Sequence, residues 1–243
     1  STKESDHAKN VTNLETLITY VIAFGTSYNP SKESLRLDAL QTLLSNSKNS
    51  LSALYVAQSH YSNAVAARES SFENFGKLST RVNNALKPTD TTVQVDESAQ
   101  TIVRKIQGKR ASAIISEEDK KLLAAEGKEI NQISTSQMSY DSKLENLDKL
   151  KALLSSVPQY SPNEEDLKID SLKIRYNELR ANNLAVLTSN IELSNARISR
   201  NEILYKPLTG LVDIAFDTKV YIKSVFGASS PQFKQISKLS FTA

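Results

Sequence analysis

The chain has 243 residues, of which 39% are hydrophobic and 23% are charged, and its formal net charge is +3. Cysteine is absent, which excludes disulfides, thiolate metal sites and cysteine nucleophiles. The small net charge implies little long-range electrostatic steering. Six glycines and six prolines are few for this length, so turns are few and the elements must be long. We therefore predict an all-α fold.

Helices are predicted from apolar residues spaced three, four or seven positions apart. The ends are set by Asn29-Pro30, Val157-Pro158 and Pro207, because proline disfavours helix in the residue before it. Gly108 suits a left-handed helix C-cap, and Ser116 with Asp119 resembles a capping box. In chain order, the predicted elements are a frayed segment 1–10, helices 11–27 and 31–73, a kink at 75–76, a helix through 78–86, a loop 87–100, and helices 101–107, 116–156, 163–204, 208–226 and a short turn from 230.

The most apolar stretch is LITYVIAF at 17–24, whereas a membrane-spanning helix needs about 20 residues. We expect a helix that is buried on most faces, with a membrane-inserting segment as the alternative. The chain begins with Ser, so we expect a processed or trimmed product, and the sequence leaves the compartment open between the cytoplasm and export.

The two halves of the chain resemble one another. YNPSKESLRLDAL at 28–40 recurs as YSPNEEDLKIDSL at 160–172, an offset of 132, with six of thirteen positions identical. Farther on, IVRKIQG at 102–108 matches YIKSVFG at 221–227 at an offset of 119. The difference equals the length of the predicted loop 87–100, so we interpret that loop as an insertion in the first of two repeats.

The predicted domains are therefore a first helical repeat, 1–115, with the inserted loop, and a second repeat, 116–243. Long helices joined by short turns must run antiparallel to bury their apolar stripes. Leu172, Leu179, Val186 and Leu193 recur at seven-residue spacing, which is typical of such packing. We predict one elongated antiparallel bundle of about six main helices, with the repeats related by a pseudo-two-fold axis.

The sequence predicts no catalytic, cofactor or metal site. The two histidines, His7 and His60, do not supply the paired Glu-x-x-His motifs of di-metal bundles, and no G-x-S-x-G elbow presents a serine. No Walker A or G-x-G-x-x-G loop is present. Enzymatic activity is therefore not expected.

The sharpest charge feature is a run of four cations, Arg104, Lys105, Lys109 and Arg110. A solvated helix end is the first interpretation, because cations there complement the helix dipole. A contact with a partner protein or an anion is the second, and nucleic acid is the third. No aromatic residue interleaves the run, and the second repeat keeps one charge in place of the four.

Two further features are candidates for a site. Asp38 and Asp170 occupy matched positions in the repeats and have no basic residue four positions away, so they are either solvated or a functional pair that binds a cation. The closing segment 227–241 carries Phe233 and Phe241, which we expect to dock on the bundle or on a partner.

FGASSPQFKQISKLSF at the end of the chain and VRKIQGKR in its middle resemble segments of a family of all-helical bacterial proteins without a known activity. The resemblance implies a helical fold and supplies no site residues. We expect a non-enzymatic structural or interaction protein with a protein partner. A polyanion-binding module using 104–110 and a membrane-associating bundle are the alternatives. The sequence leaves open whether the chain forms a homo-oligomer.

Overall fold

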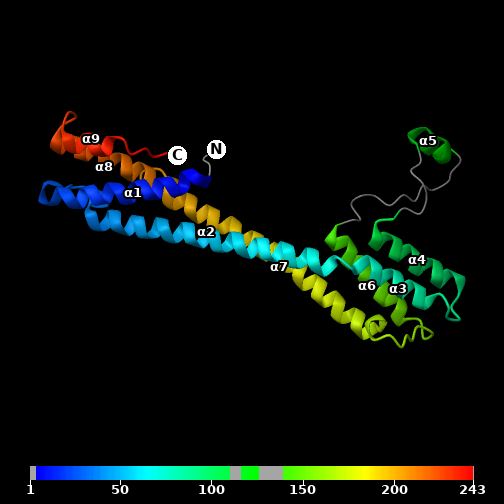
Figure 1. Cartoon of the computed structure of the whole chain (residues 1–243). Coiled ribbons are helices and arrows are strands. Elements are labelled where there is room, and N and C mark those ends of the chain that lie inside the picture. Colours follow the sequence, from blue (N-terminus) through cyan, green and yellow to red (C-terminus); the bar gives the residue numbers. More distant parts are fainter. Residues whose placement is uncertain (1–3, 110–115, 126–138, 243) are drawn as a thin grey trace. The chain divides into compact units, whose positions relative to one another are not determined.

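The computed structural model describes residues 4–109, 116–125 and 139–242 (Figure 1). These residues form helices and no strand, which confirms the all-α prediction. The elements are α1 (Glu4–Phe24), 3₁₀ turns Gly25–Ser27 and Glu33–Leu35, α2 (Leu37–Phe72), α3 (Phe75–Leu86), α4 (Val93–Gln107), α5 (Glu117–Ala125), α6 (Tyr140–Ser155), a 3₁₀ turn Glu165–Leu167, α7 (Ile169–Tyr205), α8 (Leu211–Phe226) and α9 (Pro231–Ser237).

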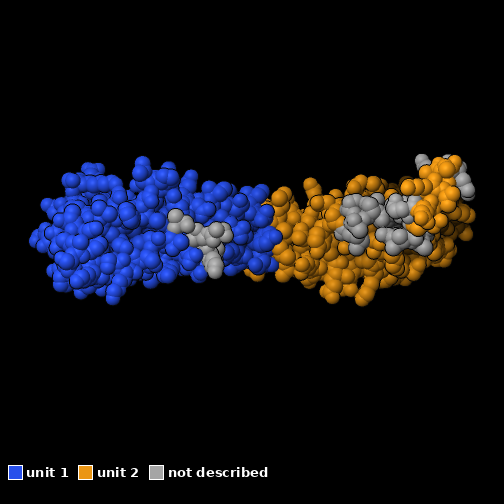
Figure 2. Space-filling model, turned by 90° about the horizontal axis from the view of Figure 1, so that it is seen from above, with its two compact units in different colours: residues 1–62, 189–243 blue, residues 63–188 orange. Residues whose placement is uncertain are grey.

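The chain divides into two compact units, which are coloured separately in Figure 2. Unit 1 comprises residues 1–62 and 189–243, and unit 2 comprises residues 63–188. These units differ from the predicted repeats 1–115 and 116–243, because each unit combines helices from both halves. Unit 1 joins α1 with α8 and α9, whereas unit 2 joins α3 and α4 with α6.

The core of unit 1 forms where α1 packs against α8, with α9 on the other side of α8 (Figure 1). Leu14, Leu17 and Ile222 are fully buried there. The apolar stretch 17–24 therefore contributes one face to a core, with Ile18 and Val21 also buried. The prediction of burial on most faces is wrong, because Thr19, Ile22 and Ala23 are exposed. Within the described ranges, no helix has the length and apolar character needed to cross a membrane.

The beginning of the chain differs from the prediction of a frayed segment 1–10. Helix α1 already starts at Glu4, and His7 and Asn10 are buried. The Nδ1 atom of His7 lies 2.5 Å from the hydroxyl of Tyr205, and the Asn10 amide donates to the carbonyl oxygen of Thr242 over 2.7 Å. These long-range polar contacts stabilise residues that the local composition marks as polar and unstructured.

The core of unit 2 lies between α4, α6 and α3. Phe75, Leu86, Ile106, Leu147 and Leu154 are fully buried within it. At the start of α7, Leu172 and Leu179 close the same core, so the predicted seven-residue seam does face inward.

The repeated Tyr-x-Pro segments form the same local structure in the two units. The Tyr28 hydroxyl donates to the carbonyl oxygen of Leu35 over 2.6 Å, and the Tyr160 hydroxyl donates to that of Leu167 over 2.7 Å. Each acceptor ends a 3₁₀ turn that precedes a long helix. Burial raises the pKa of both tyrosines to about 12, because the ionised phenolate would lose its hydration. The shared motif is thus a buried turn.

The predicted loop 87–100 is wrong in its second part, because α4 begins at Val93. Thr92 caps this helix by accepting a hydrogen bond from the backbone N–H of Val95. The connection after α3 is therefore 87–92, and a 14-residue insertion is not needed. At the constant offset of 132, the buried positions of the helices that follow α2 and α7 coincide, namely Ser79, Val82, Asn83 and Leu86 with Leu211, Ile214, Ala215 and Thr218. The origin of the two halves by duplication, and their pseudo-two-fold relation, stay predictions.

The predicted single helix 116–156 is also wrong. Ser116 does cap α5, because its hydroxyl accepts from the N–H of Asp119, as the capping-box pattern predicts. A new helix, α6, starts at Tyr140 behind Ser139, whose backbone is extended and whose hydroxyl accepts from the N–H of Ser142. Residues 126–138, in the middle of the predicted helix, lie outside the described residues.

Candidate interaction site

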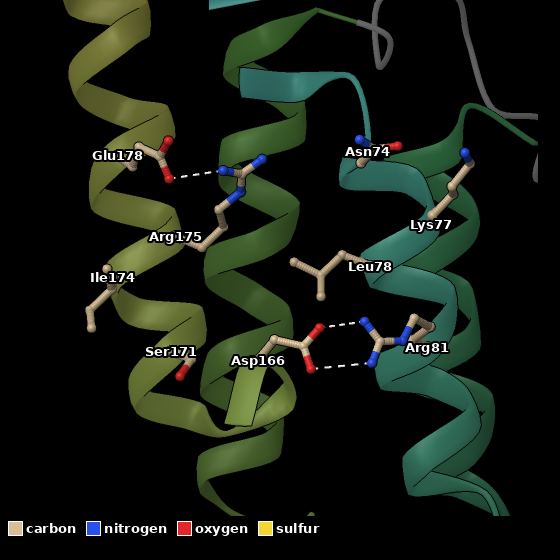
Figure 3. A pocket seen from close by; sticks show the side chains of 9 residues that line it. All are labelled: Asn74, Lys77, Leu78, Arg81, Asp166, Ser171, Ile174, Arg175 and Glu178. Carbon is tan, nitrogen blue, oxygen red and sulfur yellow. Dashed lines mark hydrogen bonds and ion pairs between the residues drawn. The ribbon is translucent and has the colours of Figure 1, made fainter. Parts of the chain in front are cut away.

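A shallow groove of about 510 Å³ lies in unit 2 between α3 and the first turns of α7 (Figure 3). Two ion pairs border it. The guanidinium of Arg81 on α3 donates two hydrogen bonds to Asp166 in the 3₁₀ turn before α7. Arg175 of α7 donates to Glu178 over 2.8 Å and to the backbone carbonyl of Ser71.

Two pairs of opposite charges line the groove, and the exposed Lys77 adds one further cation. Hydrogen bonding to Arg81 holds the pKa of Asp166 below its usual range and raises the pKa of Arg81. The Arg81–Asp166 pair ties α3 to the turn before α7, so its first role is structural. Leu78 lies between the two ion pairs, whereas Ile174 projects from α7 and is 70% exposed (Figure 3). Besides the two ion pairs, the groove therefore presents these two apolar side chains together with Asn74, Lys77 and Ser171.

The predicted basic run does not form one exposed cluster in the part of it that is described. Arg104 and Lys105 are half-buried on the last turn of α4, and Lys109 is exposed. Gly108 has a φ of 65° and forms the predicted left-handed cap, in which the Lys109 N–H donates to the Arg104 carbonyl over 2.9 Å. Arg110 lies outside the described residues. The geometry fits a capped helix end.

The local surroundings of Asp38 and Asp170 explain why a carboxylate is favourable at each position. They are exposed and occupy the first turns of α2 and α7, where a carboxylate is favoured by the helix dipole. Asp170 also pairs with Lys173, three residues on, over 3.0 Å. Asp38 belongs to unit 1 and Asp170 to unit 2. Among the described residues, no group of three or more His, Asp or Glu side chains could hold a metal.

The closing segment docks on the chain's own helices. Phe233 and Phe241 are partly buried against the core of unit 1. Three side chains hold the backbone beyond α9: Asn10 pairs with both the N–H and the carbonyl of Thr242, Asn13 donates to the carbonyl of Ser240, and Lys219 donates to that of Leu239. Of the two predicted outcomes for these phenylalanines, the structure shows docking on the bundle.

The most distinctive surface is one that the sequence prediction missed. Five large aliphatic side chains on α7 are more than half exposed: Ile174 beside the groove and, farther along the helix, Leu184, Leu187, Ile191 and Ile198. The last four are spaced by three, four and seven residues, which places them on one side of α7, and we call these four residues the α7 face. Leu184 and Leu187 belong to unit 2, and Ile191 and Ile198 belong to unit 1. The signal was present in the sequence, but the seam at 172, 179, 186 and 193 accounted for the helix without it.

Comparisons of the chain with protein-family models, with curated proteins and with solved structures find no match. The resemblance to a family of all-helical bacterial proteins therefore stays a prediction. Function has to be argued from the chain's own surfaces.

Proposed function

We propose that this chain is a non-enzymatic structural or interaction protein, and that it binds another protein chain through the α7 face. The observation that carries the proposal is the exposure of Leu184, Leu187, Ile191 and Ile198, at 53% to 57% each. Single exposed aliphatic residues are ordinary on a protein surface, but a contiguous set on one helix face is typical of an interaction site.

The α7 face lies away from the side of the helix that builds the core. Leu184, Ile191 and Ile198 each follow a buried seam residue by five positions, which is about 140° round a helix of 3.6 residues per turn. Helix α7 is thus apolar on two sides. A helix with two apolar sides usually packs against other chain segments on both sides, and the described residues of this chain pack against one of them.

The other long helix provides an internal comparison. At the offset of 132, the positions of α2 that match the α7 face are Ser52, Tyr55, Ser59 and Ala66, and all four are exposed. Helix α2 therefore forms with two serines, an alanine and a tyrosine at these positions, and with no aliphatic residue larger than alanine. The four large aliphatic residues of α7 are therefore not required by the helix itself, which favours a role in binding.

The alternatives need different surfaces. A polyanion-binding module would use 104–110, where Arg104 and Lys105 are half-buried on a capped helix end. A membrane-associating bundle would have to release Leu17, Ile18 and Val21 from the core of unit 1. The α7 face is exposed without any such rearrangement.

Site-specific photocrosslinking tests the proposal in cells of the source organism. A photoreactive phenylalanine at Leu187 is expected to give protein adducts, whereas the same group at Tyr55, the matched position on α2, is the control. An absence of adducts at position 187, or equal labelling at both positions, would contradict the proposal. Adducts with nucleic acid or lipid would favour the corresponding alternative instead.

A further inference from the structure

The end of the chain is rich in lysine and lacks acidic side chains. Residues 218–243 contain Lys219, Lys223, Lys234 and Lys238, and they contain neither Asp nor Glu. Cations that are gathered in one segment without neighbouring carboxylates raise the local positive potential and favour an anionic ligand. This segment forms the last part of α8, all of α9 and the residues beyond it, and it lies entirely in unit 1.

A hollow of about 300 Å³ lies in unit 1 between α8 and the segment that follows α9. Helix α8 contributes Val212, Phe216 and Lys219 to its lining, and the rest of the lining is residues 237–241. The two charged residues of this lining, Lys219 and Lys238, are both cations. A concave, largely apolar lining with a few polar groups is typical of a small-molecule site, and the volume is at the lower end of the usual range of about 300 to 1,000 Å³.

The ammonium group of Lys219 lacks a counter-ion among the described residues. It donates to the carbonyl oxygen of Leu239 over 2.7 Å and to that of Ser237 over 3.1 Å. Burial lowers the pKa of Lys219, because the charged form loses hydration and no nearby carboxylate offsets the loss. An ammonium has three N–H donors, so one stays available to a ligand beside the two carbonyls. A carboxylate bound there would supply the missing negative charge.

We infer that this hollow binds a small monocarboxylate with an apolar body, such as a short-chain fatty acid. The carboxylate lies between Lys219 and Lys238, since hydrogen bonds from an ammonium to an anion are the strong ones. The apolar body packs against Val212, Phe216 and Phe241 and is thereby removed from water. This site goes beyond the proposed function, because it uses no residue of the α7 face, and either can fail without the other.

The other unit provides an internal comparison for the apolar part of the lining. At the offset of 132, Val212 and Phe216 correspond to Thr80 and Asn84 of α3, which are both exposed. Helix α3 therefore forms with polar residues at these positions. Phe216 is 66% exposed, so its ring is not required for the core of unit 1 either. A large apolar side chain at this place favours a role in binding.

Titration of the whole chain with octanoate, followed by amide NMR spectra, tests the inference. Octanoate is expected to bind with a dissociation constant on the order of 0.1 to 1 mM and to shift the amide signals of 212–219 and 237–241. Acetate, which lacks the apolar body, and octanamide, which lacks the charge, should each bind at least about tenfold more weakly. Equal binding of octanoate and octanamide, or shifts confined to other residues, would overturn the inference.

Substitutions at exposed side chains test the roles of the lining residues. Phe216→Ser should weaken octanoate binding about tenfold by removing apolar contact, and Lys238→Met should weaken it about threefold, as expected for an exposed charge pair. Lys219 is kept, because it also holds the backbone beyond α9. Lys234→Met is the matched control: it removes a lysine of the same segment outside the lining and should change binding less than about twofold. An unchanged affinity of Phe216→Ser, or equal effects of Lys234→Met and Lys238→Met, would refute the site.

Discussion

Replacing Tyr28 and Tyr160 by Phe tests the interpretation of the repeated motif as a buried turn. Each substitution keeps the ring and removes one hydroxyl that donates to a carbonyl seven residues on. Both tyrosines are less than 10% exposed, so the carbonyl oxygen of Leu35 or Leu167 would lose its partner away from bulk water. We expect each variant to lower the free energy of unfolding of its own unit by about 1 to 2 kcal/mol at pH 8.

The same variants should change the pH dependence of stability. The folded-state pKa is raised to about 12, whereas the unfolded chain ionises near the ordinary value of 10.0. The contribution of each neutral hydroxyl is therefore complete below pH 10 and is lost as the pH rises from 10 to 12. At about 1.4 kcal/mol per unit, and with some solvent screening, the loss is roughly 1 to 3 kcal/mol per tyrosine.

The assay is urea unfolding followed by circular dichroism at several pH values between 8 and 11.5. The wild type should lose stability steeply above pH 10, and the double variant should lose clearly less over the same range. Tyr55→Phe is the control, because that ring is 46% exposed. Equal pH dependence of the wild type and the double variant would refute the assigned role of the two hydroxyls.

Three smaller predictions concern the backbone. Gly210→Ala should lower the free energy of unfolding by about 2 kcal/mol or more in urea titration, because a Cβ there would lie 2.6 Å from the backbone nitrogen of Lys206. Gly108→Ala should cost about 1 kcal/mol by the same measurement, since its φ of 65° is left-handed. Asn10→Ala should speed amide hydrogen exchange at Thr242, whose N–H donates to the Asn10 side chain over 2.9 Å. Unchanged stability or exchange would contradict the contact concerned.

The helical elements could be read from the sequence where local chemistry decides them. The caps at Gly108 and Ser116, the short turn from 230 and the buried seven-residue seam of α7 follow from residue types and spacing, and the structure agrees with each. Local composition gave the wrong prediction where contacts between residues far apart in the sequence hold a segment in place. His7 and Asn10 look like part of a frayed end, yet Tyr205 and Thr242, nearly 200 or more residues away, hold them in place.

The start of α4 was missed for a related reason. Residues 87–100 are rich in Thr and Asp, which favours a loop, but Thr92 acts as a helix cap and Ala99 is fully buried in the core of unit 2. The division of the chain could not be predicted either, because the boundary between the units falls inside α2 and α7, where the sequence has no break.

The candidate site was the least predictable part. Phe233 and Phe241 were correctly singled out as docking residues, but the sequence could not tell the chain's own core from a partner. The α7 face needed exposure values, because on a helix with two apolar sides the sequence pattern does not tell which side is covered. The matched positions of α2 carry no large aliphatic residue, which indicates that the long helix does not need such residues there and favours a binding role.

A single introduced cysteine tests the binding role of α7 most directly, because the chain has no cysteine of its own. Leu187→Cys carrying a photoreactive maleimide is expected to form covalent adducts with another protein, whereas Tyr55→Cys with the same label, at the matched position of α2, is not. Adducts at neither position, or equal adducts at both, would contradict the account.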